Sequence, residues 1–331
     1  MKLTSAIFVS VIVSPLLFGN TLMVGNKYAS TVSFIDLNTA REVVQPETGG
    51  SPHELTLSPD KTELVVVSYM EDGYIGQELN VFDVASTKLI KTISISPHKA
   101  PHGIEWIGDT DDVIVTTEET HDVIKVNIPE GKVVASVATD QIGTHLLALS
   151  PDAKTAYVTN RGSGTFCVID VPNMQLLKTV KAGKGPEGVT VSPDSKELWI
   201  GNNQSENIFI YDTDTLKQID TIDVQFLPIR VRFSPDGKVV AVADLHGNRI
   251  VIYDAATRKE IAAIDVASEG AIAPASLLFA PDGTYLYAGA QDGARVVEID
   301  CKTWKVVRIF KAGAGSDGLA ISPVSMKPIQ W

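Results

Sequence analysis

A short turn motif recurs along this chain of 331 residues at a nearly constant spacing. The sequence Ser-Pro-Asp, or a close variant, begins at Ser58, Ser150, Ser192, Ser234, Ala280 and Ser322. From Ser150 onward the copies are 42, 42, 46 and 42 residues apart, whereas the first step spans 92 residues. An apolar segment begins six residues after each copy except the last, and the same pattern places a degenerate copy at Ile107. The chain therefore contains seven units.

A second motif gives the same number of units. An apolar or aromatic residue followed by Asp recurs at a corresponding position in every unit, with one degenerate copy. The copies are Ile35-Asp36, Phe82-Asp83, Val126-Asn127, Ile169-Asp170, Tyr211-Asp212, Tyr253-Asp254 and Ile299-Asp300. Two separate patterns thus agree on seven units.

The pattern of apolar segments in each unit predicts four short strands. In the first unit these are residues 55–57, an almost continuously apolar segment at 64–67, a segment that ends at Asp83, and a segment near 88–93. Continuous apolarity indicates that both faces of a sheet are buried, as in sheets that pack face to face around an axis. We therefore predict an all-β fold, a seven-bladed β-propeller, with residues 21–331 as a single domain.

The two ends of the chain predict how the ring closes. The N-terminal part begins with the second strand of a unit, at 22–25, and the chain stops just after a first strand, at 318–321. Three N-terminal strands and one C-terminal strand should therefore complete the last blade, which removes the sheet edges of an open ring. An open β-solenoid, the alternative, fits this arrangement poorly.

Two segments carry a resemblance to a known family. The sequence Tyr-Val-Thr-Asn at 157–160 is the signature of the YVTN β-propeller repeats, and residues 185–194 resemble their first-strand consensus. The resemblance covers residues 21–322 and implies the propeller fold. Similar proteins include surface-layer proteins, periplasmic binding propellers, relatives of quinoprotein amine dehydrogenase subunits, and lactonases. By analogy with the lactonases, hydrolase or lyase chemistry is plausible, although a fold alone does not define a function.

The first 20 residues predict a secretory signal peptide. Lys2 precedes an apolar stretch, Ala6 to Phe18, that is too short to span a bilayer. A buried strand is the alternative reading of this stretch. We expect a periplasmic or secreted protein. Its two cysteines, Cys167 and Cys301, fall about three units apart and should be free thiols, and no Cys-x-x-Cys-His motif offers a covalent haem site.

The charge of the chain disfavours two kinds of partner, and its hydropathy predicts no membrane span. The formal net charge is −12, and no run of five basic residues occurs, so nucleic acid and anionic membrane surfaces are poor partners. No other apolar run approaches the length of a membrane span, so we predict none in the mature chain. We expect a monomer.

The histidines identify one face of the predicted propeller. In such a ring, the turns from fourth to first strand and from second to third strand lie on the same face. All six histidines fall in these two kinds of turn: His53, His98, His102, His121, His145 and His246. The two longest insertions, around 69–77 and 267–273, fall on the same face, which we take as the functional one.

One position of the repeat, here called the register, makes this prediction more specific. Five residues before each marker turn, where the first strand enters the channel, the units carry His53, His102, His145, Glu187, Ile229, Ala275 and Asp317. Three imidazoles and the Glu187 carboxylate should converge there, and they are candidate ligands for one divalent transition metal: Zn, Fe, Mn or Cu. Two alternatives stay open. The histidines could act in acid–base catalysis or ligand binding without metal, or simply line a solvated channel mouth.

Four further residues are candidate catalytic groups: Arg230, Glu118, His121 and Asp317. Arg230 occupies a position where other units carry Gly, so it should reach the axis and bind a substrate carboxylate, or instead pair with Glu187. For Glu118 and His121 the alternative is a solvated turn. The sequence thus predicts an exported propeller that binds a small molecule at a histidine-rich axial site, with metal-dependent lyase, hydrolase or isomerase activity as one reading. A non-catalytic propeller that binds a protein partner is the other.

Overall fold

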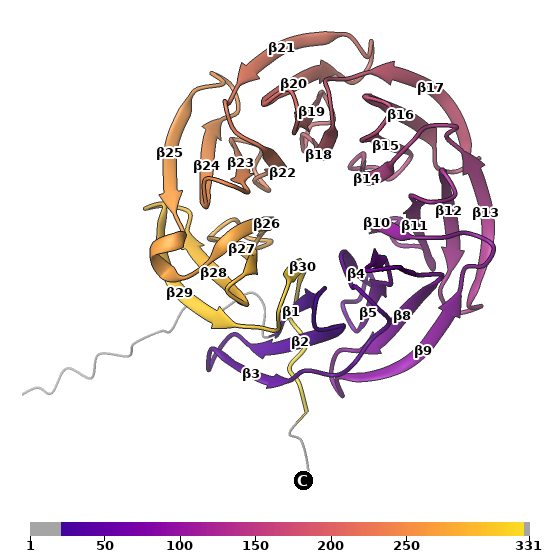
Figure 1. Ribbon diagram of the computed structural model, residues 1–331, viewed down its shortest axis with the longest axis vertical. Coiled ribbons are helices and arrows are strands. Elements are labelled where there is room, and N and C mark those ends of the chain that lie inside the picture. Colours follow the sequence, from indigo (N-terminus) through magenta and orange to yellow (C-terminus); the bar gives the residue numbers. More distant parts are fainter. Residues whose placement is uncertain (1–20, 328–331) are drawn as a thin grey trace, which may run out of the picture.

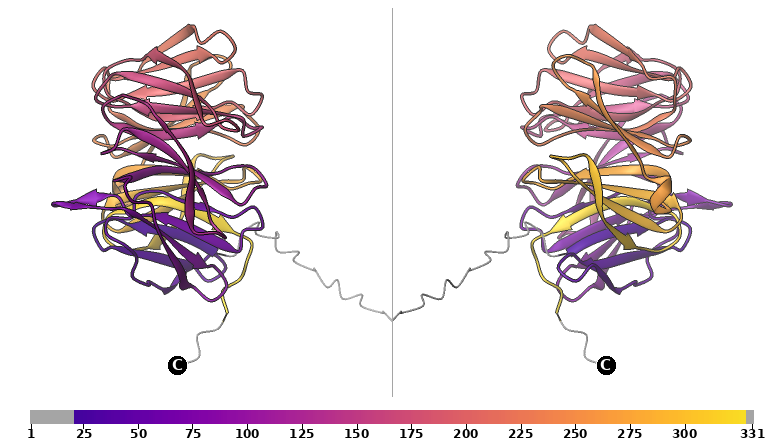
Figure 2. Two further views of the ribbon diagram at one scale, coloured as in Figure 1. Left: turned by 90° about the vertical axis from the view of Figure 1, so that its right-hand side faces the viewer. Right: turned by 90° about the vertical axis from the view of Figure 1, so that its left-hand side faces the viewer.

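The computed structural model describes residues 21–327, so the predicted signal peptide lies outside the described residues. Seven four-stranded antiparallel sheets surround a central channel, which confirms the all-β propeller (Figure 1). Viewed from the side, the ring is a flattened disc (Figure 2). Within the described part, no helix is long and apolar enough to cross a membrane.

Blades 1 to 6 follow one another along the chain, each with its first strand at the channel and its fourth at the rim (Figure 1). Blade 1 contains β4 (Leu55–Leu57), β5 (Glu63–Val67), β8 (Glu78–Asp83) and β9 (Lys88–Ser94); blade 2 contains β10 (Pro101–Trp106), β11 (Asp112–Thr117), β12 (Asp122–Asn127) and β13 (Lys132–Ala138); blade 3 contains β14 (Thr144–Leu149), β15 (Thr155–Asn160), β16 (Thr165–Asp170) and β17 (Gln175–Lys181). Blade 4 contains β18 (Pro186–Val191), β19 (Glu197–Asn202), β20 (Asn207–Asp212) and β21 (Gln218–Asp223); blade 5 contains β22 (Pro228–Phe233), β23 (Val239–Asp244), β24 (Arg249–Asp254) and β25 (Glu260–Asp265); blade 6 contains β26 (Ile272–Phe279), β27 (Tyr285–Asp292), β28 (Arg295–Asp300) and β29 (Lys305–Lys311).

Blade 7 closes the ring as the chain ends predict. Its order is β3-β2-β1-β30, with β1 (Thr21–Asn26), β2 (Thr31–Asp36) and β3 (Arg41–Val44) from the N-terminal side and β30 (Ser316–Ser322) from the C-terminal side. Strand β30 pairs antiparallel with β1, so that Thr21 lies opposite Ser322 and Val24 opposite Leu319. Strand β1 is therefore paired on both sides, with β2 and β30, and β30 supplies the inner strand of the blade.

The marker turn is a small hydrogen-bonded unit that repeats around the ring. In blade 1 the Ser58 hydroxyl donates to Asp60 Oδ1 at 2.6 Å and accepts from the backbone N–H of Glu63 at 2.9 Å. The same pair of bonds recurs in the turns that begin at Ser150, Ser192 and Ser234. These side chains satisfy backbone donors where the first strand turns into the second, which explains the fixed spacing of the motif.

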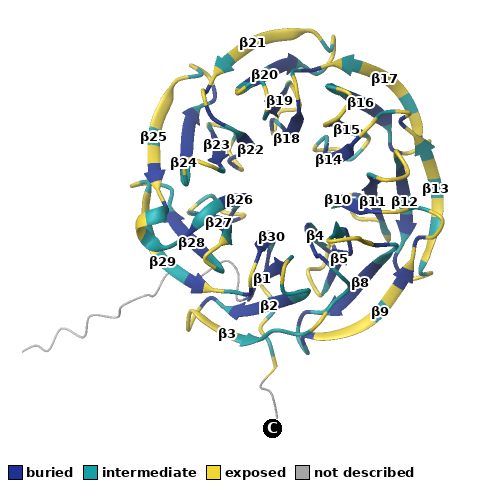
Figure 3. Ribbon diagram, in the orientation of Figure 1, coloured by how far each residue is buried: buried dark blue, intermediate teal, exposed yellow. Residues whose placement is uncertain are grey.

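Packing between blades forms the core. The second and third strands are buried on both faces, whereas the fourth strands are largely exposed at the rim (Figure 3). Between blades 1 and 2, for example, Val65 and Val67 pack with Val113 and Val115 in one apolar cluster. Burying such a side chain stabilises the fold by about 1.5–3 kcal/mol each.

The two predicted insertions add small elements to the histidine-bearing face. Residues 69–77 form a hairpin of β6 (Met70–Glu71) and β7 (Tyr74–Ile75), and residues 267–273 contain a 3-10 turn, η1 (Ala267–Glu269). Cys167 and Cys301 are both free thiols, as predicted, with Cys167 buried and Cys301 partly exposed.

Candidate functional site

The residues of the predicted register lie at or just before the beginning of the inner strands. His102, His145 and Glu187 are each the second residue of their strand, and His53 lies two residues before β4. The pairing of β10 with β11 shifts register between Pro101 and Ile104, and β14 and β18 show the same irregularity. A bulge at this point turns consecutive side chains toward the axis.

Glycine at the next position lets neighbouring inner strands approach closely. A Cβ on Gly103 would lie 3.0 Å from the backbone oxygen of His145, and one on Gly318 would lie 2.4 Å from that of His53. The Gly318 N–H donates to the same His53 oxygen at 2.7 Å. This close approach brings side chains from different blades within contact distance at the channel mouth.

The three imidazoles converge into a stack. The ring centroids of His102 and His145 lie 3.8 Å apart with planes 30° apart, and those of His53 and His102 lie 4.8 Å apart. The Tyr69 ring, from the start of the first insertion, meets the edges of His53 and His102 at 4.5 Å. All three histidines are buried, with exposed fractions of 8% or less.

His145 is held between two carboxylates. Its Nδ1 lies 2.5 Å from Glu118 Oε2, an oxygen that also accepts the Tyr69 hydroxyl at 2.6 Å. Its Nε2 lies 3.2 Å from Glu187 Oε1 and 3.3 Å from Arg161 Nη1. Burial opposes the charged imidazole, but the Glu187 charge and the hydrogen bonds with both carboxylates outweigh it and raise the pKa of His145.

The other two imidazoles, those of His53 and His102, have surroundings that disfavour the charged form. His53 Nε2 and His102 Nδ1 are buried and have no hydrogen-bond partner. Burial first, and then the neighbouring positive charges, including that of His145, lower the pKa of both well below the usual value. His53 has one polar contact at its other nitrogen, where Nδ1 lies 3.3 Å from Asp317 Oδ2. Both rings are therefore neutral near pH 7.

Arg230 reaches the axis, as predicted, but its partner differs from the one that the sequence suggested. Its Nη2 lies 2.5 Å from Glu54 Oε1 and 3.8 Å from Asp317 Oδ1, and its Nε donates to the Ala275 oxygen at 3.1 Å. Glu187 pairs instead with Arg161, at 3.1 Å. The pairing of Arg230 with Glu187 is thus corrected, because Glu54 lies across the channel mouth from Arg230.

A second ring of residues completes the site. The sequence analysis did not recognise that these residues occupy one repeated position. At the end of the second strand or within two residues after it, the blades carry Lys27, Tyr69, Glu118, Arg161, Asn203, Leu245 and Gln291. All of these except Lys27 lie eleven residues after a marker turn. Two of its members had not been singled out although they bond to the first ring: Asn203 Nδ2 donates to Glu187 at 2.5 Å, and Gln291 Nε2 donates to Asp317 at 3.2 Å. The same register rule that found the histidines would have found this ring.

These two rings enclose a cavity of about 250 Å³ at the channel mouth. Its lining includes His53, His102, His145, Glu187 and Arg230, together with most of the second ring. Burial, and then repulsion by Glu54, raise the pKa of the Asp317 carboxyl at its edge to about 6. The cavity is therefore strongly polar and holds acidic, basic and neutral titratable groups side by side.

His121 lies apart from this cavity. Its side chain is exposed in the turn between β11 and β12, its backbone is left-handed with φ 56°, and its carbonyl oxygen accepts from Thr139. It does not line the cavity, because the turn carries it away from the axis. The structure thus brings Glu118, Arg230 and Asp317 to the site but leaves His121 outside it.

The four predicted metal ligands lie close together, and two of them, His145 and Glu187, are hydrogen-bonded to each other. Within residues 21–327, no group of three or more His, Cys, Asp or Glu side chains is arranged to hold a metal ion. Both nitrogens of His145 face carboxylates, which leaves His53 Nε2 and His102 Nδ1 as the buried imidazole nitrogens that lack a partner. Metal binding therefore stays a prediction.

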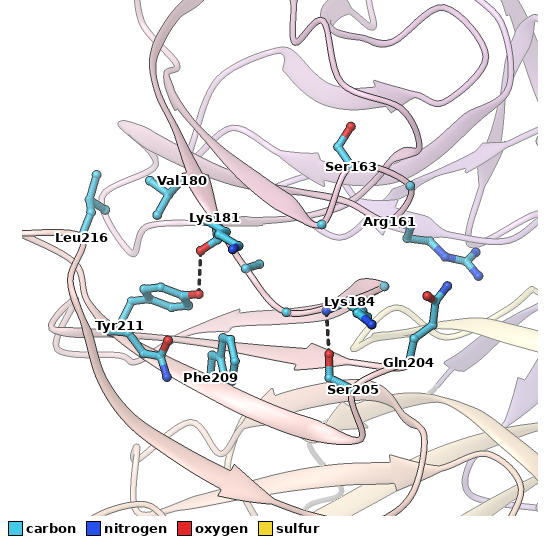
Figure 4. Close-up of a pocket in the computed structure, with 16 residues that line it drawn as sticks. Arg161, Ser163, Val180, Lys181, Lys184, Gln204, Ser205, Phe209, Tyr211 and Leu216 are labelled. Carbon is cyan, nitrogen blue, oxygen red and sulfur yellow. Dashed lines mark hydrogen bonds between the residues drawn. The ribbon is translucent and has the colours of Figure 1, made fainter.

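A larger groove lies beside the site, between blades 3 and 4. Figure 4 shows Arg161 at one end and Leu216 at the other, and the groove has a volume of about 770 Å³. Its polar contacts are structural: the Tyr211 hydroxyl donates to the Lys181 oxygen at 3.0 Å, and the Lys184 N–H donates to Ser205 at 2.6 Å. No His, Asp or Glu lines it, so the groups suited to acid–base chemistry lie in the axial cavity.

Comparisons with known proteins agree with this architecture. The family model described as "Lactonase, 7-bladed beta-propeller" matches residues 30–321. A search of curated proteins gave no match. Among solved structures, a chain of hydrazine synthase from Kuenenia stuttgartiensis is similar, with 20% identity, a TM-score of 0.72, and coverage of 82% of this chain and 90% of that chain. A functionally unknown protein from Desulfotomaculum acetoxidans is similar at 15% identity and a TM-score of 0.76, covering 92% of this chain and 99% of that one. At these identities the structures show the shared fold alone.

Proposed function

The chain belongs to the seven-bladed β-propeller lactonase family, and from this premise we propose that its axial cavity hydrolyses a small cyclic ester. In this proposal the buried histidines supply the acid and the base. Residues 1–20 would act as the export signal that the sequence predicts, so the reaction would take place outside the cytoplasm.

One observation carries the proposal: two stacked imidazoles have opposite surroundings. His145 lies between the Glu118 and Glu187 carboxylates, whereas His102 Nδ1 is buried without a partner. The first arrangement favours the imidazolium and the second favours the neutral ring. Neighbouring groups whose environments push their pKa values apart are typical of an acid and a base that act in one reaction.

The chemistry follows from these two states. His102 takes a proton from a water molecule while the water oxygen attacks the carbonyl carbon of the ester ring. His145 Nε2 exchanges its hydrogen bond with Glu187 for one to the carbonyl oxygen and stabilises the charge that develops there. When the ring carbon–oxygen bond breaks, His145 passes a proton to the leaving alkoxide, and the product is an open-chain hydroxy acid. Loss of the proton from His102 and uptake of one by His145 then restore the starting state.

Size and charge restrict the substrate. The cavity of about 250 Å³ lies below the range of about 300–1,000 Å³ that is usual for drug-sized ligands, so it suits a single small ring. Arg161 and Arg230 are both paired with carboxylates, which leaves little excess positive charge. We infer an uncharged, polar lactone as the preferred substrate.

Metal-assisted hydrolysis is the second candidate, because two buried imidazole nitrogens and Asp317 Oδ1 have no hydrogen-bond partner. His53 and His102 would hold such a metal, which would lower the pKa of a bound water and so supply the nucleophile. In both candidates the histidine cluster is the functional centre.

An assay of hydrolysis with γ-butyrolactone, δ-valerolactone and their hydroxylated derivatives tests the proposal. The reaction is monitored in weak buffer through the protons that the acid product releases. The wild type should hydrolyse at least one of them, and His145→Gln should lower kcat by about 10²–10⁴-fold. His121→Gln, the same change at an exposed site outside the cavity, should retain full activity. Absence of hydrolysis across the panel would overturn the proposal and favour a propeller that binds a protein partner.

A further inference from the structure

The central channel has a second cavity at its other end. It is lined by the later residues of the inner strands and by the marker turns, including Pro59, Pro193 and Pro235, which lie on the face opposite the histidines. Its volume is about 590 Å³. Arg230 lines both cavities, so its ion pair with Glu54 lies between them.

Large apolar side chains form part of the wall of this lower cavity, beside charged ones. Leu57, Trp106, Phe233 and Phe279 line it, each from a different inner strand or its end. Large apolar side chains around a concave surface on the axis suit the body of a small molecule more than water alone. The walls therefore favour a ligand with an apolar part.

Arg232 places a positive charge among these apolar residues. It lies on β22 two positions after Arg230, so both side chains point to the channel side of that strand. Among the described residues, Arg232 forms no ion pair, and its Nε is buried without a hydrogen-bond partner. An arginine in this situation has hydrogen-bond donors available for an anion.

The other charged groups of the cavity do not neutralise Arg232 by direct contact. Glu54 and Arg230 pair with each other, and Lys61 belongs to a marker turn. Glu105 lies across the cavity on β10, where its Oε2 accepts from the Leu149 N–H at 3.3 Å. Burial raises the pKa of Glu105 to about 7, so it is only partly charged at neutral pH.

We propose that the lower cavity binds an anionic amphiphile, a molecule with one carboxylate or sulfonate on an apolar body. The anion would accept hydrogen bonds from the Arg232 guanidinium, and the body would lie against Trp106, Phe233 and Phe279. This site is distinct from the histidine cavity and does not depend on the proposed hydrolysis. Both fatty acids and aromatic acids have this chemistry.

Titration with 8-anilinonaphthalene-1-sulfonate, an aromatic anionic fluorophore, tests the proposal at pH 8. Arg232→Gln should weaken binding about tenfold or more, because it removes a charge-assisted contact. Glu105→Gln should tighten binding severalfold at that pH, because it removes a nearby negative charge. Arg41→Gln, the same change on the exposed strand β3, is the matched control and should bind as the wild type does.

Two further measurements locate the ligand and identify its class. Energy transfer from tryptophan to the bound dye should fall in Trp106→Phe if the dye occupies this cavity. Competition by decanoate indicates a fatty acid site, and competition by naphthoate alone indicates a site for aromatic acids. Since Arg232 forms no ion pair, Arg232→Gln should fold with unchanged circular dichroism. Equal dye binding by the Arg232 and Arg41 variants would overturn the proposal.

Discussion

The imidazole rings of His102 and His145 lie face to face, with centroids 3.8 Å apart and planes 30° apart, although the residues come from neighbouring blades. One ring is bonded to carboxylates at both nitrogens, and the other has a buried nitrogen without a partner. Two charged imidazoles could not stack at this distance without strong repulsion. The arrangement therefore favours a stack in which His145 is the charged imidazolium and His102 is the neutral ring.

The first prediction concerns Glu118. Glu118→Gln removes one of the two carboxylate charges that favour the protonated form of His145, so kcat should fall by about 10²-fold or more. Because the proposed acid must be protonated, activity is lost as pH rises through the raised pKa of His145. The variant lowers that pKa, so the alkaline limb of the kcat profile should move to lower pH. Glu119→Gln, at the exposed neighbouring position, should leave the profile unchanged.

The second prediction concerns the base. His102→Gln should lower kcat by about 10²–10⁴-fold while the KM for a lactone changes little, because proton transfer is lost and the cavity keeps its size. His121→Gln serves again as the exposed control. A His102 variant with wild-type kcat would assign the base to His53 or to another group.

The third prediction separates the two mechanisms at the histidine cluster. Protein dialysed against EDTA should keep its lactone hydrolysis within about twofold, because the proposed acid, His145, and the proposed base, His102, act without a metal. Elemental analysis of the same sample gives the metal content. Loss of activity in EDTA, with recovery on adding Zn²⁺ or Mn²⁺, would favour the metal-assisted candidate.

The fourth prediction concerns the stability of the channel. Arg230→Met leaves Glu54 without its ion-pair partner in a mostly buried position, and such a change typically costs about 3–5 kcal/mol in the free energy of unfolding. The double variant Arg230→Met with Glu54→Gln should recover much of this loss. Urea unfolding monitored by tryptophan fluorescence measures both. If Arg230→Met is as stable as the wild type, the ion pair between Arg230 and Glu54 contributes nothing to the free energy of unfolding, and the prediction is wrong.

The fifth prediction concerns ring closure. A chain that ends at Lys311 lacks β30, so blade 7 loses the strand that pairs with β1 and exposes an edge beside the channel. Such a chain should unfold without a cooperative transition and elute as aggregates in size-exclusion chromatography. A chain that ends at Lys327 keeps β30 and should unfold as the full chain does. Cooperative unfolding of the shorter chain would show that β30 is dispensable.

Several features of the fold were predictable because they depend on local chemistry. In the marker turns that begin at Ser58, Ser150, Ser192 and Ser234, Ser and Asp occupy fixed positions because the Ser hydroxyl bonds both to the Asp and to the backbone of the turn. The spacing of this turn therefore indicated seven blades. Because the described chain begins with a second strand and ends with a first strand, the sequence also predicted the pairing of β1 with β30. The register before each turn also placed His53, His102 and His145 at one mouth of the channel.

The partners of these side chains were decided only by the tertiary structure. Nothing near Arg230 in the sequence distinguishes Glu54 from Glu187, because the choice depends on which carboxylate the curvature of the ring brings within reach. His102 and His145 occupy the same register, yet their pKa values shift in opposite directions. That difference arises from burial and from neighbours contributed by other turns, which act through space and leave no local pattern in the chain.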